Sequence, residues 1–250
     1  MLESDLCITI WVKGGKSIYE VLNAGKDKAY HLKRLGDAVH LEFMSEGGKV
    51  APMKIDIDLR MAARLNKNDG DARAYVLGNG RKTGHEYLYA YDSLTAKVLA
   101  THTDGKYNAV STPDYLEHGL IDKERKIVVH HNHPNNAPPS ISDVMSVSSY
   151  SGIDAAFIHG HDGSFYKIQP LQRGNIEKAT KAMSKAAKIA SRTSEFASLS
   201  DLEYAWLIGV SRVSALSKAG FIKLTSNVVM SENIKKMTEL MTVAAIQSIK

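Results

Sequence analysis

The chain has 250 residues, of which 44 % are hydrophobic and 24 % are charged, so it is long enough to bury a core without disulfide bonds. Its single cysteine, Cys7, excludes an internal disulfide and fits a reducing compartment. The formal net charge of +5 is too small to indicate nucleic-acid binding by itself. No segment reaches the ~18 apolar residues of a membrane span, and the N-terminus lacks the basic start and apolar segment of a secretory signal. We therefore expect a cytoplasmic protein with one larger domain or two smaller ones and no membrane contact.

Residues 1–74 predict a mixed α+β region to which the sequence assigns no chemistry. Cys7 lies in an apolar run, and we interpret it as a buried strand residue rather than a nucleophile. The elements predicted in this region are a strand at 7–12, a helix from Lys16 to Arg34 interrupted near Gly25, a strand at 39–44, and a strand running into a short helix at 55–65. Turn signals follow at Asn68-Asp69-Gly70 and Gly78-Asn79-Gly80.

Residues 75–170 alternate between strands and short helices and contain two hairpin signals. The predicted strands are 86–91, 97–103, 127–131, 155–159 and 164–168. A short helix or loop is predicted at 115–120, and a helix is predicted to begin at Ser140. Hairpin-paired strands mixed with helices indicate the α+β class.

Residues 171–250 predict a helical C-terminal region. Its predicted helices are an Ala- and Lys-rich one at 175–192, one that opens with the capping box Ser200–Glu203 and ends near Gly220, and one that Ser231 caps and that reaches Lys250. We expect the lysines at 178, 181, 185 and 188 on a solvated face, and Trp206 in the core. Because these helices have apolar stripes and no chemistry of their own, we expect them to pack beside the 75–170 domain or to mediate oligomerisation.

The most informative segment is Val-Val-His-His-Asn-His-Pro at 128–134, followed by Ser-Ile-Ser-Asp at 140–143. Alternate residues of a strand share a face, so His131 and His133 present two imidazoles together. Ser140 can cap a helix that carries Asp143 in its first turn, and the short loop between can fold that helix back onto the histidines. Two imidazoles and one carboxylate leave a fourth position for water, which is typical of a catalytic zinc site.

Hydrolysis at such a site also needs a general base. Zinc lowers the pKa of a bound water to roughly 7, and the base must accept a proton and later deliver one to the leaving amine. Glu86 is the candidate, because it begins an aromatic-rich strand, where a carboxylate is costly to bury without a purpose.

The His-x-His-Pro at 131–134 with Ser-x-x-Asp at 140–143 resembles the motif of the JAB/JAMM (MPN+) zinc metalloproteases. The His-Asn-His-Pro form is similar to the RadC branch and to JAB domains of phage and toxin proteins. The resemblance covers about residues 75–170 and implies a JAB/MPN-like, cytidine-deaminase-like mixed sheet with flanking helices. The implied roles are zinc ligands for His131, His133 and Asp143, general base for Glu86, and oxyanion stabilisation for Ser140.

The activity that this resemblance implies is hydrolysis of a peptide or isopeptide bond in a protein or peptide substrate, for which a ubiquitin-like protein is one candidate. Nucleic acid is disfavoured as a partner, because the row of lysines at 178–188 has no interleaved aromatic residues. Two other functions stay open. One is a JAB-like module that binds a partner without catalysis. The other is a metal-dependent nuclease of the HNH type, suggested by the literal His-Asn-His at 131–133 although no ββα distribution of these residues is visible.

Other histidines have less specific interpretations. His130 could replace His131 as a ligand, but residues three apart on a strand point to opposite faces. His159 and His161 form a second His-x-His, whose flanking glycines and aspartate favour a structural hairpin over a second metal site. His85 is either an exposed turn residue or a group that orients substrate.

Overall fold

The computed structural model describes residues 29–35, 38–44, 55–174, 176–192, 196 and 199–249. It divides into two compact units, residues 1–71 and residues 72–250, which are considered separately. The expected strand at 7–12 with Cys7, and residues 16–28 of the expected helix, lie outside the described residues.

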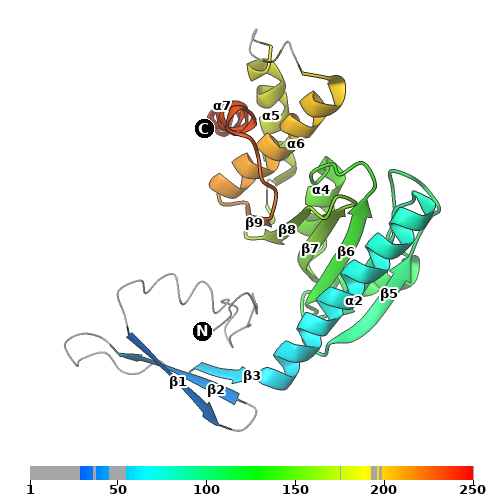
Figure 1. Ribbon diagram of the computed structural model, residues 1–250, viewed down its shortest axis with the longest axis vertical. Coiled ribbons are helices and arrows are strands. Elements are labelled where there is room, and N and C mark those ends of the chain that lie inside the picture. Colours follow the sequence, from blue (N-terminus) through cyan, green and yellow to red (C-terminus); the bar gives the residue numbers. More distant parts are fainter. Residues whose placement is uncertain are drawn as a thin grey trace. The chain divides into compact units, whose positions relative to one another are not determined.

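The first unit contains an antiparallel sheet of three strands in the order β1-β2-β3 (Figure 1). The strands are β1 (Ala29–Leu35), β2 (Ala38–Met44) and β3 (Ile55–Asp58). The predicted strands at 39–44 and from Ile55 are confirmed, but a helix through Arg34 is wrong, because 29–35 pairs along its whole length with β2. The register joins Leu35 to Ala38, at the adjoining ends of the two strands.

Helix α2 (Leu59–Thr83) is far longer than the short helix predicted from the sequence, and the two turn signals at 68–70 and 78–80 lie inside it. Both predicted turns are therefore wrong. Ala72 and Val76 lie on one buried side of this helix, four residues apart, and burial of that side outweighs the weak helix propensity of the glycines.

The second unit is built on a six-stranded mixed sheet in the order β5-β4-β6-β7-β8-β9. The strands are β4 (Leu88–Asp92), β5 (Lys97–His102), β6 (Ile127–His133), β7 (Ile153–Gly160), β8 (Phe165–Pro170) and β9 (Ile222–Ser226). β6 and β7 are parallel, and the other neighbours are antiparallel. Strand β9 was not predicted: the C-terminal region is not wholly helical but contributes an edge strand through its register with β8.

Five further helices complete this unit: α3 (Asp114–Ile121), α4 (Ile141–Ser149), α5 (Ile176–Ala190), α6 (Asp201–Lys218) and α7 (Glu232–Gln247). Their positions agree with the sequence prediction, and the α+β class is confirmed. None of the helices in the described ranges is both long and apolar enough to cross a bilayer.

The two faces of the sheet differ in what covers them. One face carries Leu88, Val129 and Ile158, which join the largest core cluster together with buried residues of α3, α4, α5 and α6. The opposite face carries Tyr89, whose ring lies 5.9 Å from that of Tyr75 on α2. Alternate residues of each central strand point to these two faces, so neighbouring positions along one strand have different surroundings.

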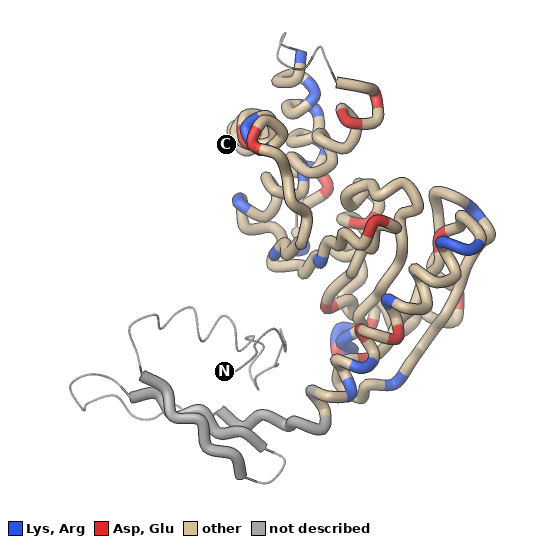
Figure 2. The backbone as a smooth tube through the Cα atoms, in the orientation of Figure 1, with Lys and Arg blue, Asp and Glu red and all other residues tan. Residues whose placement is uncertain are grey.

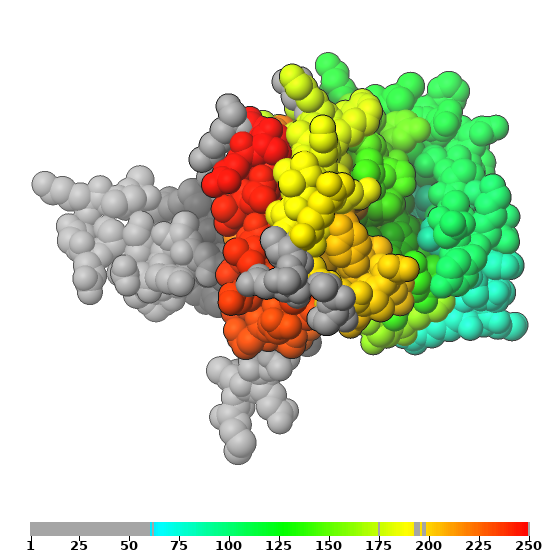
Figure 3. Space-filling model, turned by 90° about the horizontal axis from the view of Figure 1, so that it is seen from above, coloured from blue at the N-terminus to red at the C-terminus, as the bar shows by residue number. Residues whose placement is uncertain are grey.

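The helices α5, α6 and α7 pack against one another, and α5 and α7 lie side by side at the surface in Figure 3. The four lysines at 178, 181, 185 and 188 are exposed, as predicted. Figure 2 shows basic and acidic positions interspersed along the second unit. Trp206 on α6 is only partly buried against the core clusters, so the prediction of a core tryptophan is correct only in part.

On the α2 side of the sheet, two buried histidines form a pair. His130 Nδ1 lies 3.0 Å from His159 Nε2, and the rings of both stack on Phe157. Burial, with the neighbouring charge of His130, lowers the pKa of His159 to about 2. His159 therefore stays neutral in the folded protein at pH values where it is protonated in the unfolded chain.

This pair predicts a specific acid sensitivity. Below a pH of ~6.5 the unfolded chain binds a proton at His159 that the folded protein does not, so the free energy of unfolding falls by up to about 1.4 kcal/mol per pH unit from this group alone. His159→Gln removes the titration, and its free energy of unfolding, measured by urea denaturation between pH ~6.5 and ~4.5, should depend less steeply on pH. The exposed His118 is the matched control: His118→Gln should keep the wild-type slope. Equal slopes for His159→Gln and the wild type would contradict the argument.

Candidate metal centre

His131 and His133 lie at the carboxyl end of β6 and point to the same face of the sheet, as the strand periodicity predicts. Their register fixes this arrangement: His131 lies opposite Leu88 of β4 on one side and Ile158 of β7 on the other. Both histidines are buried. The strand therefore delivers two imidazoles into the interior with little freedom to move apart.

The third group comes from the first turn of α4. Ser140 is the N-cap, its Oγ accepts a hydrogen bond from Asp143 N at 3.1 Å, and Asp143 Oδ2 accepts one from Ser140 N at 2.6 Å. This capping box holds the carboxylate against the loop that follows β6. Asp143 Oδ1 lies 3.2 Å from His131 Nε2, and Asp143 Oδ2 lies 3.5 Å from His133 Nε2. The five-residue connection between Pro134 and Ser140 is thus long enough to bring Asp143 to the histidines.

Helix α6 supports this loop from outside. Arg212 donates from Nη2 to the carbonyl oxygen of Pro139 at 2.6 Å. A Cβ added at Gly209 would lie 2.5 Å from Pro138 Cγ, so the absence of a side chain there lets the helix approach the proline closely. The C-terminal region therefore helps to position the helix that carries Asp143.

The three groups have the spacing of ligands around one ion. The two Nε2 atoms of His131 and His133 are 3.2 Å apart, and the nitrogen–oxygen distances to Asp143 are 3.2 and 3.5 Å. Ligand atoms ~2.0 Å from a tetrahedral metal are separated by about 3.3 Å. Among the described residues these three form the group of His, Cys, Asp or Glu side chains that could hold a metal ion. The structure thus supports a metal site at these residues without identifying the metal.

One hydrogen bond at the site favours the tautomer of His133 that a metal ligand needs. His133 Nδ1 lies 2.9 Å from the carbonyl oxygen of Ala137, to which it donates when protonated. A proton on Nδ1 leaves the lone pair of His133 Nε2 directed toward His131 and Asp143. Such a partner behind a histidine ligand fixes both its tautomer and its ring orientation.

The pKa values of the three groups reflect their closeness. Burial opposes the charged form of His131, but Asp143 and Glu86 outweigh it and raise the pKa of His131. Burial and the charge of His131 lower the pKa of His133. Burial also opposes the charged form of Asp143, yet the two histidines hold its pKa well below the usual range. The carboxylate is therefore ionised at neutral pH, as a metal ligand must be.

Glu86 and Ser140 line the same cavity as these three residues, a space of about 510 Å³ under the connection between β5 and α3. Glu86 is only 7 % exposed, and burial raises its pKa to about 7. A carboxyl group with that pKa can both accept and return a proton near neutral pH. The structure therefore gathers all five predicted site residues at one cavity.

Asn132 is a residue of this region whose role the sequence did not reveal. It is fully buried and points to the face opposite the histidines. Its Oδ1 accepts from Tyr87 N at 2.8 Å, and its Nδ2 donates to the His85 carbonyl oxygen at 3.0 Å, so one amide group ties down the backbone on both sides of Glu86. A signal was present in the sequence: Asn132 lies between two candidate ligand histidines on a buried strand, so its amide must face the opposite side of the sheet and needs partners there.

The remaining histidines lie outside the three-residue group. His130 faces the α2 side with His159, as the strand periodicity predicts for it. His161 meets Asn132 Nδ2 at 2.9 Å from the same side. His159 is a buried residue of β7, within the predicted strand at 155–159. His85 is half-buried and is not among the residues that line the cavity.

Comparison of the chain with models of protein families, with curated proteins and with solved structures finds no match.

The geometry predicts one divalent cation per chain. Elemental analysis of the purified protein should give a 1:1 ratio. His131→Ala and Asp143→Ala should each weaken binding by more than the ~10–100-fold that loss of an outer partner costs, because each removes a ligand. His118→Ala, which removes an exposed histidine elsewhere, should leave the ratio unchanged. A full complement of metal in His131→Ala would contradict the site.

Proposed function

We propose that the protein is a zinc-dependent metallopeptidase or isopeptidase with a JAB/JAMM-like site. One observation carries the proposal. The imidazoles of His131 and His133 and the carboxylate of Asp143 line one cavity together with Glu86, a separate carboxyl group whose pKa is raised. The mixed sheet with helices on both faces is compatible with the JAB-like architecture that the motif implies.

The donor set fits zinc. Two imidazole nitrogens and one carboxylate oxygen are ligands that Zn²⁺ accepts, and three protein ligands leave a fourth position open. When bound at His131, His133 and Asp143, zinc would lower the pKa of a coordinated water toward neutrality and polarise a substrate carbonyl.

Glu86 has the properties of the proton carrier. It precedes β4, and the register of Leu88 with His131 puts it beside the end of β6, where the two histidines lie. Its carboxylate would accept a proton from the attacking water and return it to the leaving amine. A pKa of about 7 allows both transfers near neutral pH, and bound zinc would lower this pKa by adding positive charge.

Ser140 can stabilise negative charge on the substrate oxygen. Its Oγ accepts a hydrogen bond from Asp143 N, which leaves its own O–H free to donate. In the structure Ser140 Oγ is 2.7 Å from Ser142 Oγ, so the hydroxyl can rotate between Ser142 and an oxygen in the cavity. A donor of this kind is useful where charge develops in the transition state.

The nuclease alternative has less support. In the literal His-Asn-His at 131–133, the side chain of Asn132 faces away from the two histidines and is occupied by the backbone of residues 85 and 87. It is therefore not available to the cavity in which His131 and His133 lie.

Replacement of Glu86 tests the proposal. Glu86→Gln keeps the shape of the side chain but cannot carry a proton, so it should retain zinc and lose hydrolysis by at least ~100-fold in kcat. The measurement is mass-spectrometric detection of cleavage in a synthetic peptide library and in a panel of ubiquitin-like fusion proteins, with zinc content determined in parallel. Chelation of the wild type should abolish the same cleavage, and added zinc should restore it. Full hydrolytic activity in Glu86→Gln would show that Glu86 is not the base.

Asn132 is expected to act through Glu86 as a positioning residue. Asn132→Leu leaves the Tyr87 N–H and the His85 carbonyl without partners, which costs about 1–3 kcal/mol each and loosens the backbone around Glu86. We expect zinc to be retained, KM to be nearly unchanged and kcat to fall by roughly 10–100-fold.

Asn227 offers a matched control, because its amide bridges Phe165 N and the Gly163 carbonyl oxygen in the same manner. Asn227→Leu should lower stability without changing kcat. Equal kcat values for Asn132→Leu and the wild type would remove the positioning role.

A further inference from the structure

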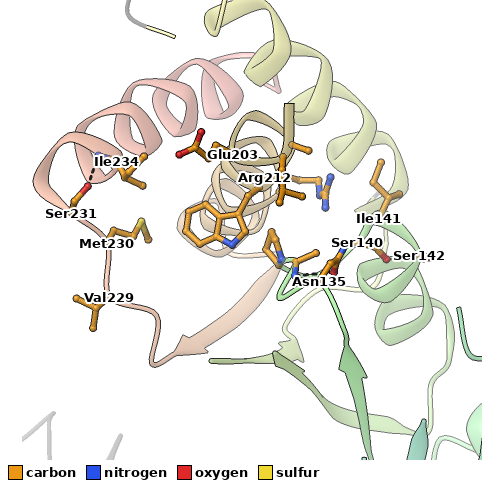
Figure 4. A pocket seen from close by; sticks show the side chains of 16 residues that line it. Asn135, Ser140, Ile141, Ser142, Glu203, Arg212, Val229, Met230, Ser231 and Ile234 are labelled. Carbon is orange, nitrogen blue, oxygen red and sulfur yellow. Dashed lines mark hydrogen bonds between the residues drawn. The ribbon is translucent and has the colours of Figure 1, made fainter. Parts of the chain in front are cut away.

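A second cleft opens beside the metal centre, between the loop that precedes α4 and the helices α6 and α7 (Figure 4). Its volume is about 810 Å³. The residues that line both this cleft and the metal-site cavity are Asn135, Ala137, Pro138, Ser140 and Ser142. The cleft is therefore continuous with the wall of the cavity rather than a separate feature of the surface.

The lining of the cleft is mostly apolar. Trp206 of α6 is only partly buried, and Met230 and Ile234 contribute side chains from the start of α7 and the segment before it. At the rim, Leu202 is 66 % and Val229 is 94 % exposed. Large apolar side chains gathered around a concave surface are a common mark of a ligand-binding groove.

Arg212 adds a polar group to this lining. It is only 7 % exposed, and one of its donors, Nη2, is used by the Pro139 carbonyl oxygen. Its Nε has no hydrogen-bond partner within the described part of the chain. A buried guanidinium with unused donors is costly unless an acceptor completes it. Because this Nε is itself inaccessible to solvent, the established role of Arg212 here is to hold the Pro139 carbonyl in the wall of the cleft.

We propose that this cleft receives a large apolar side chain of the substrate, at one fixed position a few residues from the scissile bond. Arg212 provides a polar group in the wall of the cleft. The inference rests on the proposed peptidase function and deepens it: the preferred substrate is a peptide segment with Leu, Ile, Met, Phe or Trp at that position. A helix pair on one side and the α4 loop on the other would thus select the substrate that the metal site cleaves.

The test uses the full-length zinc-loaded protein and a synthetic library of random decapeptides, with cleavage sites read by mass spectrometry. Cleaved peptides should share an apolar residue at one position relative to the cleaved bond. Val229→Asp and Leu202→Asp should each raise KM for a selected peptide by about tenfold, with kcat and zinc content unchanged, because a charge at the rim disfavours an apolar side chain. Both residues are exposed, so the variants should fold normally.

Leu240→Ala supplies the control, since Leu240 is an exposed apolar residue of α7 that does not line the cleft. It should keep the wild-type KM. A cleaved set with no apolar preference, or an unchanged KM in Val229→Asp and Leu202→Asp, would overturn the inference while leaving the peptidase intact. Light scattering gives a further check. If the wild type forms a concentration-dependent dimer and Val229→Asp dissociates it, the cleft binds a second copy of the chain and the inference is overturned.

If the protein is not a peptidase, the cleft is tested by peptide binding rather than by cleavage. If the wild type cleaves no peptide, binding of fluorescein-labelled library peptides is measured by anisotropy instead. Binding of apolar peptides that Val229→Asp and Leu202→Asp weaken would support the cleft and reject the peptidase. Absence of binding would reject both.

Discussion

Strand β6 is buried along its whole length, yet four of its seven residues are polar. Buried polar groups must find partners within the protein, and the alternation of a strand divides them between two sides. His131 and His133 turn toward Asp143. His130 and Asn132 turn toward the α2 side, where a second histidine and the backbone beside Glu86 satisfy them. The candidate metal centre and the segment that carries its proposed base are thus organised by one strand.

The other half of the candidate centre depends on two contacts at the end of the loop that leads into α4. The capping box at Ser140 fixes Asp143 at the start of α4, and Arg212 on α6 binds the carbonyl oxygen of Pro139 just before it. This second contact links the C-terminal helices to the geometry of the metal site. The same helix contributes to the apolar cleft, so one element both supports the proposed chemistry and bounds the surface proposed to select its substrate.

The sequence predicted elements best where local pattern and tertiary contacts agree. The hairpin of β4 and β5, the strand that carries the histidines, and the capped helices α4 and α6 were expected where the structure has them. It failed where tertiary contacts override local preference. Glycine-rich turn signals lie inside α2 because a buried face stabilises that helix, and residues 29–34 form a strand because β2 pairs with them. Strand β9 has a weak pattern of its own and exists through its pairing with β8.

The sequence by itself determined the donor set. Strand periodicity puts His131 and His133 on one face, and the Ser140–Asp143 spacing makes the capping box that carries Asp143, the third candidate ligand. Tertiary structure alone decided that Asp143 lies 3.2 and 3.5 Å from the two histidines, that Glu86 enters the same cavity, and that Asn132 and Arg212 support them. The physical reason is the range of each effect. Periodicity and capping act over a few residues, whereas these contacts join segments distant in the chain and exist only when the sheet and helices are packed.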